Sequence, residues 1–525
     1  MSALHRRAFL TRTAAVAAAA ATGATALPAP AGAFTGGTPH FSSGAYVRPR
    51  PEALDDPTEL TLAEAAWAIR YGKLTPSELV EAYLARIGTF DPVYQAFNTV
   101  LADQARAAAK AAGRRRHTGP LHGIPLAIKD NYWTAGVRTT ANSYLFQDFV
   151  PPADATAVAR LKAAGAIVLG KTQMGPLATT RATTPDGRIT TVNAWTPTIP
   201  GTDPGGSSTG TATSVAGRMA TSGTGTQTGG SITAPSNAQN LTGLKPTMGR
   251  VSLAGIIPLS YTRDHPGPLA RDAKDAAIML TAMAGEDPAD PRTQGLPPLP
   301  DLIEAATPAF VRGKVRARRT RVGVLPGYAT SAPRQALLAT LDAIDGISLV
   351  DVPLPDQWDL LTGTEFNNVR LPERSEPFMP YLRTDLRGFG VSLTGWLQGA
   401  LLGSNEFLTG QRAKLLLLER VLDQVFESCD VVVQTSPVPF DILGLPEIGF
   451  PIGFTAAGVP VGAILGAAPY EEDRLLSVVA AYQAVTDWHW RRPADPPAPA
   501  LAARAMTASD DRGRLTAEEV AEQTQ

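Results

Sequence analysis

The sequence predicts an α/β protein whose central sheet is largely covered by helices. Short apolar runs typical of buried strands recur along the chain, and helix-start signals lie between them. Alternation of strands with helices is the pattern of an α/β fold. The chain has 525 residues, of which 44% are hydrophobic and 18% are charged. It is therefore long enough to bury a large core, and its composition excludes an intrinsically disordered protein.

The clearest helix start is Thr75-Pro76-Ser77-Glu78, which combines an N-cap threonine, a proline at the first helical position and a glutamate three residues after the cap. It predicts a helix over 76–87. A second helix is expected over 154–164, where Gly165 ends it. The predicted strands are the apolar runs at 123–128, 166–169, 321–325, 347–352, 430–434 and 459–465.

Residues 200–231 are dense in Gly, Thr and Ser. Such a stretch is either a flexible linker or a place where the backbone approaches a site closely. The apolar segment 212–219 is long enough for a short buried helix, which favours the second interpretation.

Both ends of the chain are predicted to lie outside the folded domain. Arg6-Arg7 precedes an Ala-rich apolar run at 13–27, and Ala31-Gly32-Ala33 supplies a small-x-small cleavage site. This order resembles a twin-arginine secretion signal over 1–33, although an ordinary Ala-rich helix is the alternative. We therefore expect the twin-arginine export machinery as a partner and a secreted or periplasmic mature protein starting near Phe34. An extended lead-in (34–58), the main domain (59–492) and a Pro-rich, charged tail (493–525) complete the predicted organisation.

Composition also limits partners and cofactors. The formal net charge is −1, which disfavours a nucleic-acid partner. The single cysteine, Cys429, excludes an intramolecular disulfide and a cysteine-based zinc site. The six histidines are scattered without an HExxH or HxH pair. We expect neither a metal nor an organic cofactor.

Two motif matches fail on their structural context. Residues 165–172 fit the P-loop pattern GxxxxGK[ST], but a helix precedes the first glycine and the intervening residues resemble a strand. Residues 206–210 fit the GxSxG nucleophile elbow centred on Ser208, but a turn precedes them where that motif needs a strand. The elbow stays open as an alternative because His265 and His489 follow it.

Three segments together indicate chemistry. Lys129 closes an apolar strand, Gly205-Gly206 precedes Ser207, and Gly229-Gly230 precedes Ser231. A lysine at a strand end is ordinarily solvated, but a buried one has a lowered pKa and can act as a general base. Paired glycines allow consecutive N–H groups to point at one developing oxyanion. From the residues alone a Ser-Lys catalytic site is a hypothesis, and a solvated lysine at a strand end stays the alternative.

The segments GPLHGIPLAIKDN, PGGSS, GTQTGGSI and GLKPTMGRVS occur in this order, and GVPVG follows near the end of the domain. Together they resemble the amidase signature family over residues 60–490. The resemblance implies a single α/β/α domain around a large, mixed, twisted sheet and a Ser-cisSer-Lys triad. Ser231 is then the nucleophile, Ser207 the bridging serine on a cis peptide bond, and Lys129 the general base. The oxyanion hole would be formed by the backbone amides of Thr228, Gly229, Gly230 and Ser231.

The resemblance implies a serine amidase that hydrolyses a linear carboxamide, with a small molecule or a peptide amide as substrate. The usual pattern around the nucleophile is GTDTGGSIR, but Gln227 replaces the Asp and Thr233 the Arg. A similar pattern, with Thr after Ser-Ile and an Asp-x-Pro-Gly-Pro segment downstream (here 264–268), occurs in the bacterial peptide-amidase branch, which removes C-terminal amides. The alternatives are an esterase or carbamate hydrolase with the same triad, or a non-catalytic binding protein. The predicted export and the lack of basic excess argue against the tRNA transamidation subunit.

Other polar residues are expected to have supporting roles. We predict a structural hydrogen bond for His122, a loop position for His265, a buried thiol for Cys429 and a structural or pocket-edge role for Lys171. Asp130 and Asn131 should anchor the loop after Lys129. Substrate specificity should come from 172–182 and 356–412, in which no single aromatic residue is assigned to the pocket.

Overall fold

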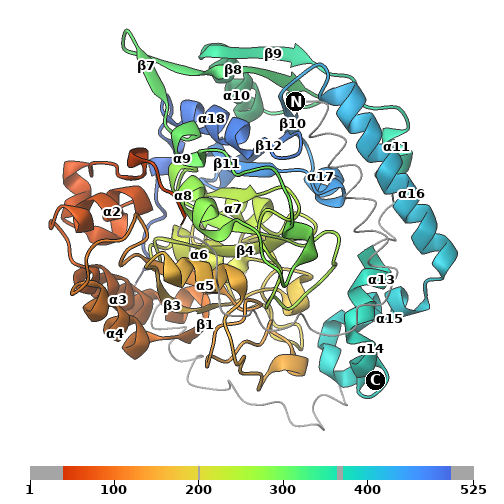
Figure 1. Cartoon of the computed structure of the whole chain (residues 1–525), viewed down its shortest axis with the longest axis horizontal. Coiled ribbons are helices and arrows are strands. Elements are labelled where there is room, and N and C mark those ends of the chain that lie inside the picture. Colours follow the sequence, from red (N-terminus) through yellow and green to blue (C-terminus); the bar gives the residue numbers. More distant parts are fainter. Residues whose placement is uncertain (1–38, 199–200, 364–369, 498–525) are drawn as a thin grey trace.

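A twelve-stranded mixed sheet runs through the part of the chain that the structure describes (Figure 1). The computed structural model describes residues 39–198, 201–363 and 370–497. The predicted signal peptide, the start of the lead-in and most of the predicted tail lie outside these residues. The strand order is β1-β3-β2-β4-β6-β5-β11-β12-β10-β8-β7, with β9 paired to β8. The predicted α/β class with a mixed central sheet is confirmed.

The strands are β1 (Phe97–Val100), β2 (Pro125–Lys129), β3 (Ile167–Thr172), β4 (Ser222–Gln227), β5 (Thr242–Lys245), β6 (His265–Ala270), β7 (Ala309–Val311), β8 (Lys314–Val324), β9 (Asp345–Asp351), β10 (Val431–Gln434), β11 (Glu447–Phe454) and β12 (Pro460–Ala467). Parallel pairs join β2 to β3 and β4, and β8 to β9 and β10. Antiparallel pairs make up the centre, from β4 through β6, β5, β11 and β12 to β10.

The helices are α2 (Leu62–Arg70), α3 (Pro76–Tyr94), α4 (Ala102–Ala112), α5 (Thr156–Ala163), α6 (Thr209–Ala216), α7 (Thr233–Ala238), α8 (Ala273–Met283), α9 (Leu302–Ala305), α10 (Ala332–Asp342), α11 (Trp358–Leu361), α13 (Arg370–Ser375), α14 (Met379–Leu382), α15 (Leu393–Leu401), α16 (Ser404–Arg420), α17 (Val438–Leu443) and α18 (Glu472–Gln483). Figure 1 shows α2, α3 and α4 together on one side of the molecule, and α11 and α13–α16 on the other.

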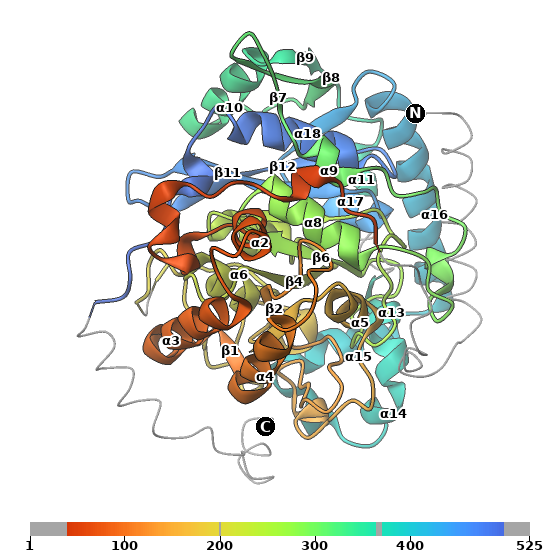
Figure 2. The same ribbon diagram turned by 60° about the vertical axis from the view of Figure 1, so that its left-hand side comes forward.

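Helices cover both faces of the sheet, as β11 shows. A Cβ built on Gly449 would meet Thr233 of α7, whereas the ring of Phe450 packs against Tyr482 of α18. Successive residues of a strand point to opposite faces, so α7 and α18 lie on opposite sides. Helix α8 packs against α18 and β6, and both helices are seen in Figure 2.

The strand order brings the carboxyl ends of two neighbouring strands, β2 and β4, together at one end of the sheet. Strands β2 and β4 are parallel neighbours, with Leu126 opposite Ser222 and Ala127 opposite Gly223. Their last residues, Lys129 and Gln227, are therefore at the same end of the sheet. In sheets of this kind the carboxyl ends of parallel strands are where sites form.

All six predicted strands are confirmed, with shifted ends. The predicted helices over 76–87 and 154–164 correspond to α3 and α5, but α3 continues to Tyr94. Val93 and Tyr94 are entirely buried, and their packing carries the helix two residues past Pro92. The predicted helix at 212–219 corresponds to α6, which begins directly after Ser208.

Strand β4 was not predicted, because its sequence SGTGTQ lacks the apolar residues expected of a buried strand. All six of its residues are nevertheless buried. A Cβ on Gly223 or Gly225 would lie 2.4–2.6 Å from neighbouring atoms, so small residues are required where the strand meets its surroundings.

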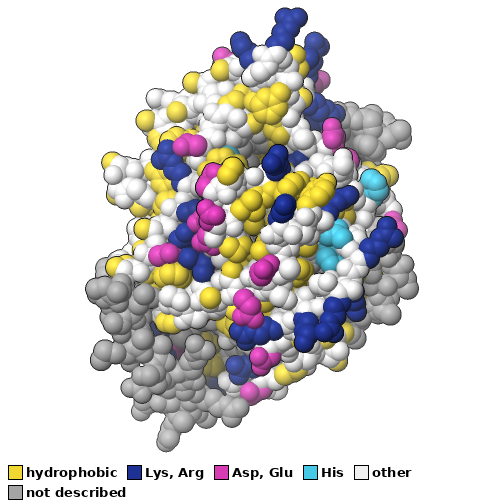
Figure 3. Space-filling view, turned by 90° about the vertical axis from the view of Figure 1, so that its left-hand side faces the viewer, with side chains coloured by type: hydrophobic (Ala, Val, Ile, Leu, Met, Phe, Trp, Pro, Cys, Tyr) yellow, Lys and Arg dark blue, Asp and Glu magenta, His cyan; other side chains and the backbone are white. Residues whose placement is uncertain are grey.

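The exposed surface carries both signs of charge. On the face shown in Figure 3, Lys and Arg side chains are interspersed with Asp and Glu over most of the surface and project at its top. Within the described residues, no helix has both the length and the apolar character needed to cross a bilayer.

One buried carboxylate joins helix α2 to helix α8. Asp275 of α8 is entirely buried and accepts the first N–H groups of α2, from Leu62 at 2.8 Å and Ala63 at 3.0 Å. We expect Asp275→Ala to lower the free energy of unfolding by about 2–4 kcal/mol, because it leaves two buried donors without an acceptor. Chemical denaturation measures this change. The control is Asp103→Ala, at a fully exposed carboxylate in the first turn of α4; equal effects of the two variants would contradict the assignment.

Candidate functional site

Lys129 lies at the centre of a buried cluster of neutral oxygen atoms. Its side chain is 0% exposed. Its Nζ lies 2.9 Å from Ser207 Oγ, 3.0 Å from Ser208 Oγ, 2.8 Å from Thr226 Oγ1 and 3.3 Å from Thr226 O. Within the described residues, no carboxylate forms an ion pair with Lys129. Asn131 donates to the same Thr226 hydroxyl at 3.1 Å and so orders the cluster.

The other two entirely buried lysines differ from Lys129 in having carboxylate partners. Lys171 lies 3.3 Å from Asp130, and Lys245 lies 3.7 Å from Glu447. Burial lowers the pKa of Lys129 to about 7, while the more distant charge of Asp264 opposes this shift. Because removing an unpaired ammonium from water is costly, the neutral amine is favoured in this setting.

Ser207 and Ser208 follow two glycines that the backbone packing requires. The Gly206–Ser207 peptide bond is cis. A Cβ on Gly206 would lie 2.5 Å from Thr180 O, and one on Gly205, which has φ +74°, would lie 2.6 Å from Pro235 Cα. Both contacts are too close for any side chain. The glycines thus allow the serine pair to approach the end of β2.

The two serines are distinguished by their hydrogen bonds. Ser208 Oγ donates to the carbonyl of Ser231 at 2.6 Å, so its proton is committed and it can only accept from Lys129. Among the described residues, Ser207 Oγ has no partner other than Lys129. Ser207 is therefore able to donate its proton to a neutral Lys129. The buried position and bonding of Ser208 do not suit the nucleophile of an elbow.

Ser231 lies at the end of a loop whose backbone amides are unbonded. It is 9% exposed, compared with 1% for Ser207, and Gly229 is exposed, with open space where its Cβ would lie. Within the described chain, the N–H groups of Gly229, Gly230 and Ser231 make no hydrogen bond. Gly230 has φ +95°, a conformation that favours glycine. The loop therefore presents free donors beside a reachable hydroxyl.

Side chains fix both ends of this loop. Gln227 Oε1 accepts the N–H groups of Ile232 and Thr233, each at 2.8 Å. Thr228 Oγ1 donates to Asp264, which also accepts the N–H groups of Leu259 and Ser260. The sequence motifs gave no role to Thr226 or Asp264, and they marked Ser208 only as the centre of the nucleophile-elbow match. The positions of Ser208 beside Ser207 and of Thr226 beside Gln227 were the signals that could have placed both residues in the cluster.

Most of the expected supporting roles are confirmed. The ring nitrogens of His122 lie 3.2 Å from Thr118 Oγ1 and 3.1 Å from Ala112 O. Cys429 is buried, and burial raises its pKa to about 12. Lys171 donates to Tyr132 O and to Thr139 Oγ1.

The anchoring role of Asp130 is also supported by its contacts. Its Oδ2 accepts from Asn98 Nδ2 at 2.8 Å and from the N–H and hydroxyl of Thr140 at 3.0 and 2.6 Å. The predicted loop position of His265 is wrong. His265 begins β6, lies opposite Gln227 of β4 and is 1% exposed, because β6 pairs along the whole length of β4 up to this residue.

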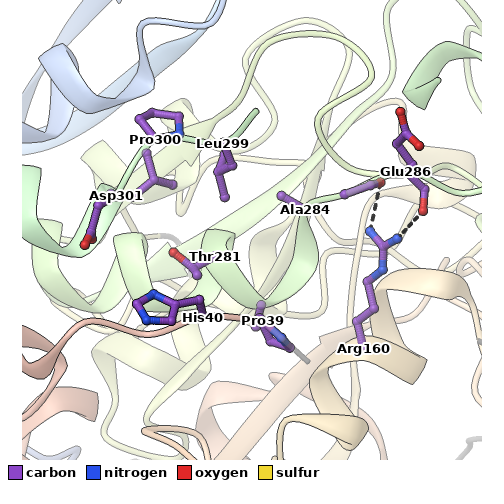
Figure 4. A pocket seen from close by; sticks show the side chains of 12 residues that line it. Pro39, His40, Arg160, Thr281, Ala284, Glu286, Leu299, Pro300 and Asp301 are labelled. Atoms are coloured by element: carbon purple, nitrogen blue, oxygen red, sulfur yellow. Dashed lines mark hydrogen bonds between the residues drawn. The ribbon is translucent and has the colours of Figure 1, made fainter. Parts of the chain in front are cut away.

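Figure 4 shows a separate pocket, which has a volume of about 560 Å³. None of its lining residues belongs to the cluster. Arg160 is one of the lining residues, and its guanidinium donates to the carbonyls of Met283, Gly285 and Glu286. These bonds tie α5 to the end of α8, so Arg160 has a structural role here.

Comparison with known proteins agrees with the geometry. The amidase family profile matches residues 78–363. A glutamyl-tRNA(Gln) amidotransferase subunit from Roseiflexus sp. (strain RS-1) is 37% identical over 83% of this chain and 98% of its own length. The native peptide amidase from Stenotrophomonas maltophilia has a TM-score of 0.72 and 29% identity, covering 84% of this chain and 98% of that one.

An amidase family protein from Bacillus anthracis str. Ames also has a TM-score of 0.72, with 26% identity over 85% of this chain and 95% of that one. The profile match, the length of the sequence similarity and the shared fold agree with one another. This chain belongs to the amidase family, the amidase signature enzymes that act on carbon–nitrogen bonds.

Proposed function

We propose that this protein is a secreted serine amidase that hydrolyses linear carboxamides through an acyl-enzyme intermediate. The observation that carries the proposal is the entirely buried Lys129 amine, surrounded by neutral oxygens and adjacent to the uncommitted hydroxyl of Ser207. A neutral amine has two N–H groups, which satisfy Ser208 and Thr226, and one lone pair, which remains for Ser207.

In the proposed reaction, Ser231 Oγ attacks the amide carbonyl while its proton passes to Ser207, whose own proton passes to Lys129. The backbone amides of Thr228, Gly229, Gly230 and Ser231 stabilise the oxyanion. The protonated Lys129 then returns its proton through Ser207 to the leaving nitrogen. Ammonia or an amine departs, and water hydrolyses the acyl-enzyme by the same route. The residues themselves supply every proton transfer.

The favoured substrate class is a C-terminally amidated peptide. Likeness to the Stenotrophomonas peptide amidase and the uncharged Gln227–Thr233 variant support this choice. A second candidate is the amide of glutamine, because the sequence relatives include a component of a tRNA amidotransferase. The predicted export signal and the net charge of −1 favour hydrolysis of an extracytoplasmic substrate without a nucleic-acid partner.

The nucleophile can be identified by fluorophosphonate labelling of the protein from Phe34, followed by peptide mass spectrometry. We expect the label on Ser231 and a labelling rate about 10²–10⁴-fold lower in Lys129→Ala, since that variant lacks the general base. Ser214→Ala is the matched control, because the hydroxyl of this buried serine of α6 bonds, among the described residues, only to Thr211 O. Label on Ser208, or equal labelling of Lys129→Ala, would contradict the proposed triad.

The reaction class can be tested with amidated dipeptides, glutamine, propionamide, a p-nitrophenyl ester and an aryl carbamate. We expect kcat/KM to be highest for an amidated dipeptide, and every activity to be lost in Ser231→Ala. Release of ammonia or of the ester alcohol is the readout. Turnover of the ester or carbamate alone would support the rival hydrolase classes, and preference for glutamine would support the second candidate.

A further inference from the structure

Gln227 connects the nucleophile loop to a buried ion-pair cluster. Its side chain is 0% exposed, and both the oxygen and the nitrogen of its amide group form hydrogen bonds. Oε1 accepts the N–H groups of Ile232 and Thr233, while Nε2 donates to Asp441 Oδ1 at 2.8 Å and to Glu447 Oε2 at 3.0 Å. Two donors and two acceptor sites are the whole hydrogen-bonding capacity of an amide, and all four are occupied.

The bonds to Ile232 and Thr233 close the loop on itself. Gln227 precedes the loop and Ile232 follows Ser231, so one side chain fixes the distance between the entry and exit of the segment that holds the free amides. From its other side the loop is held by the Thr228 bond to Asp264. A small shift at residue 227 would therefore displace Ser231 and its neighbouring donors together.

The far end of Gln227 faces two carboxylates that share one cation. Lys245 Nζ lies 3.7 Å from Glu447 Oε2 and 4.0 Å from Asp441 Oδ1, and it also donates to Leu445 O. All three charged side chains are entirely buried. Burial raises the pKa of Asp441 and, together with the charge of Asp441, that of Glu447.

A carboxylate at position 227 would be unfavourable beside this cluster. It could accept from Ile232 and Thr233, but its second oxygen would face Asp441 and Glu447 without a proton to donate. Thr233, which stands where the family usually has Arg, offers no compensating charge. An amide accepts hydrogen bonds from the loop N–H groups and also donates hydrogen bonds to the two carboxylates.

We infer that Gln227 is a positioning residue for the nucleophile loop, transmitting the placement of the Lys245–Asp441–Glu447 cluster to Ser231 and the oxyanion amides. Its effect on catalysis rests on the proposed function. Its effect on the loop is independent of the reaction.

The first test is Gln227→Leu, which keeps the side-chain volume and removes every hydrogen bond of the Gln227 side chain, including the one from the Thr233 hydroxyl at 3.3 Å. We expect kcat and the rate of fluorophosphonate labelling to fall about 10²-fold, comparable to loss of one oxyanion donor, with KM changed less than about threefold. The matched control is Gln483→Leu. Gln483 is a buried glutamine that accepts from the N–H of Ala273 at 2.9 Å and donates to Thr242 Oγ1 at 3.0 Å. Within the described residues its side chain bonds to neither the loop nor the Lys245–Asp441–Glu447 cluster, so this variant should lose thermal stability while its labelling rate is retained.

The second test exchanges the amide and the acid. Gln227→Glu alone should reduce labelling, whereas Gln227→Glu combined with Glu447→Gln should restore at least a third of the wild-type rate, because an amide then donates towards an acid across the same contact. If Gln227→Leu fails to fold, these variants still test whether Gln227 positions the loop. Failure of the exchange to improve on Gln227→Glu would overturn the inference.

Hydrogen–deuterium exchange separates this inference from the proposed function. In wild type, the amides of Ile232 and Thr233 should be protected, and in Gln227→Leu they should exchange at least 10-fold faster while peptides from β11 change little. An unlabelled wild type would contradict the proposed amidase activity. Unchanged exchange at residues 232–233, or a labelling rate of Gln227→Leu within threefold of a labelled wild type, would contradict the role of Gln227.

Discussion

The structure of the site depends on one lysine side chain being taken out of water without a counter-charge. Lys129 is buried among the hydroxyls of Ser207, Ser208 and Thr226, and burial lowers its pKa from 10.5 to about 7. Between these two pH values the unfolded chain binds a proton that the folded chain does not. Folding is therefore disfavoured by this group as the pH falls through that window. The protein tolerates this loss of stability at the residue that the proposed reaction uses.

The surrounding structure provides the conditions for that burial. Parallel strands β2 and β4 bring Lys129 and Thr226 to one edge of the sheet. Gly205 and Gly206 allow the serine pair to approach that edge, since side chains there would overlap the neighbouring backbone. Ser208 then joins Lys129 to the carbonyl of Ser231. Lys129, Ser207 and the loop that carries Ser231 are thus held by one continuous set of neutral hydrogen bonds.

Apolar runs and helix caps were sufficient to predict the fold class, because burial of a strand or of a helix face leaves a periodic hydrophobic pattern. Strand β4 was not predicted because it consists of Gly, Thr, Ser and Gln. The burial of these residues depends on close packing of the backbone and leaves no apolar pattern in the sequence. His265 was misplaced in a loop for a related reason: its neighbours Pro266 and Gly267 suggest a turn, yet β6 is a fully buried strand.

The sequence motifs identified Lys129, Ser207 and Ser231 as candidate site residues. The motifs did not predict which distant residues contact the site. Asp264 follows Thr228 by 36 residues and Asp441 follows Gln227 by 214. Such contacts arise from the order of strands across the sheet. The replacement of a charged pair by Gln227 and Thr233 was visible in the sequence, whereas the two carboxylates that make an amide suitable there became visible only in the structure. Sequence relatives and structural neighbours agree on the family and differ in the activities that their names give.

The central claim is that Lys129 is a neutral amine at physiological pH, and direct titration tests it. The chain has only nine lysines, so protein labelled with ¹³C at lysine Cε should give few NMR resonances, and the resonance that is missing from Lys129→Gln identifies the site. We predict that this resonance titrates with a midpoint near pH 7. A lysine 129 resonance that remains that of an ammonium up to about pH 10 would contradict the account.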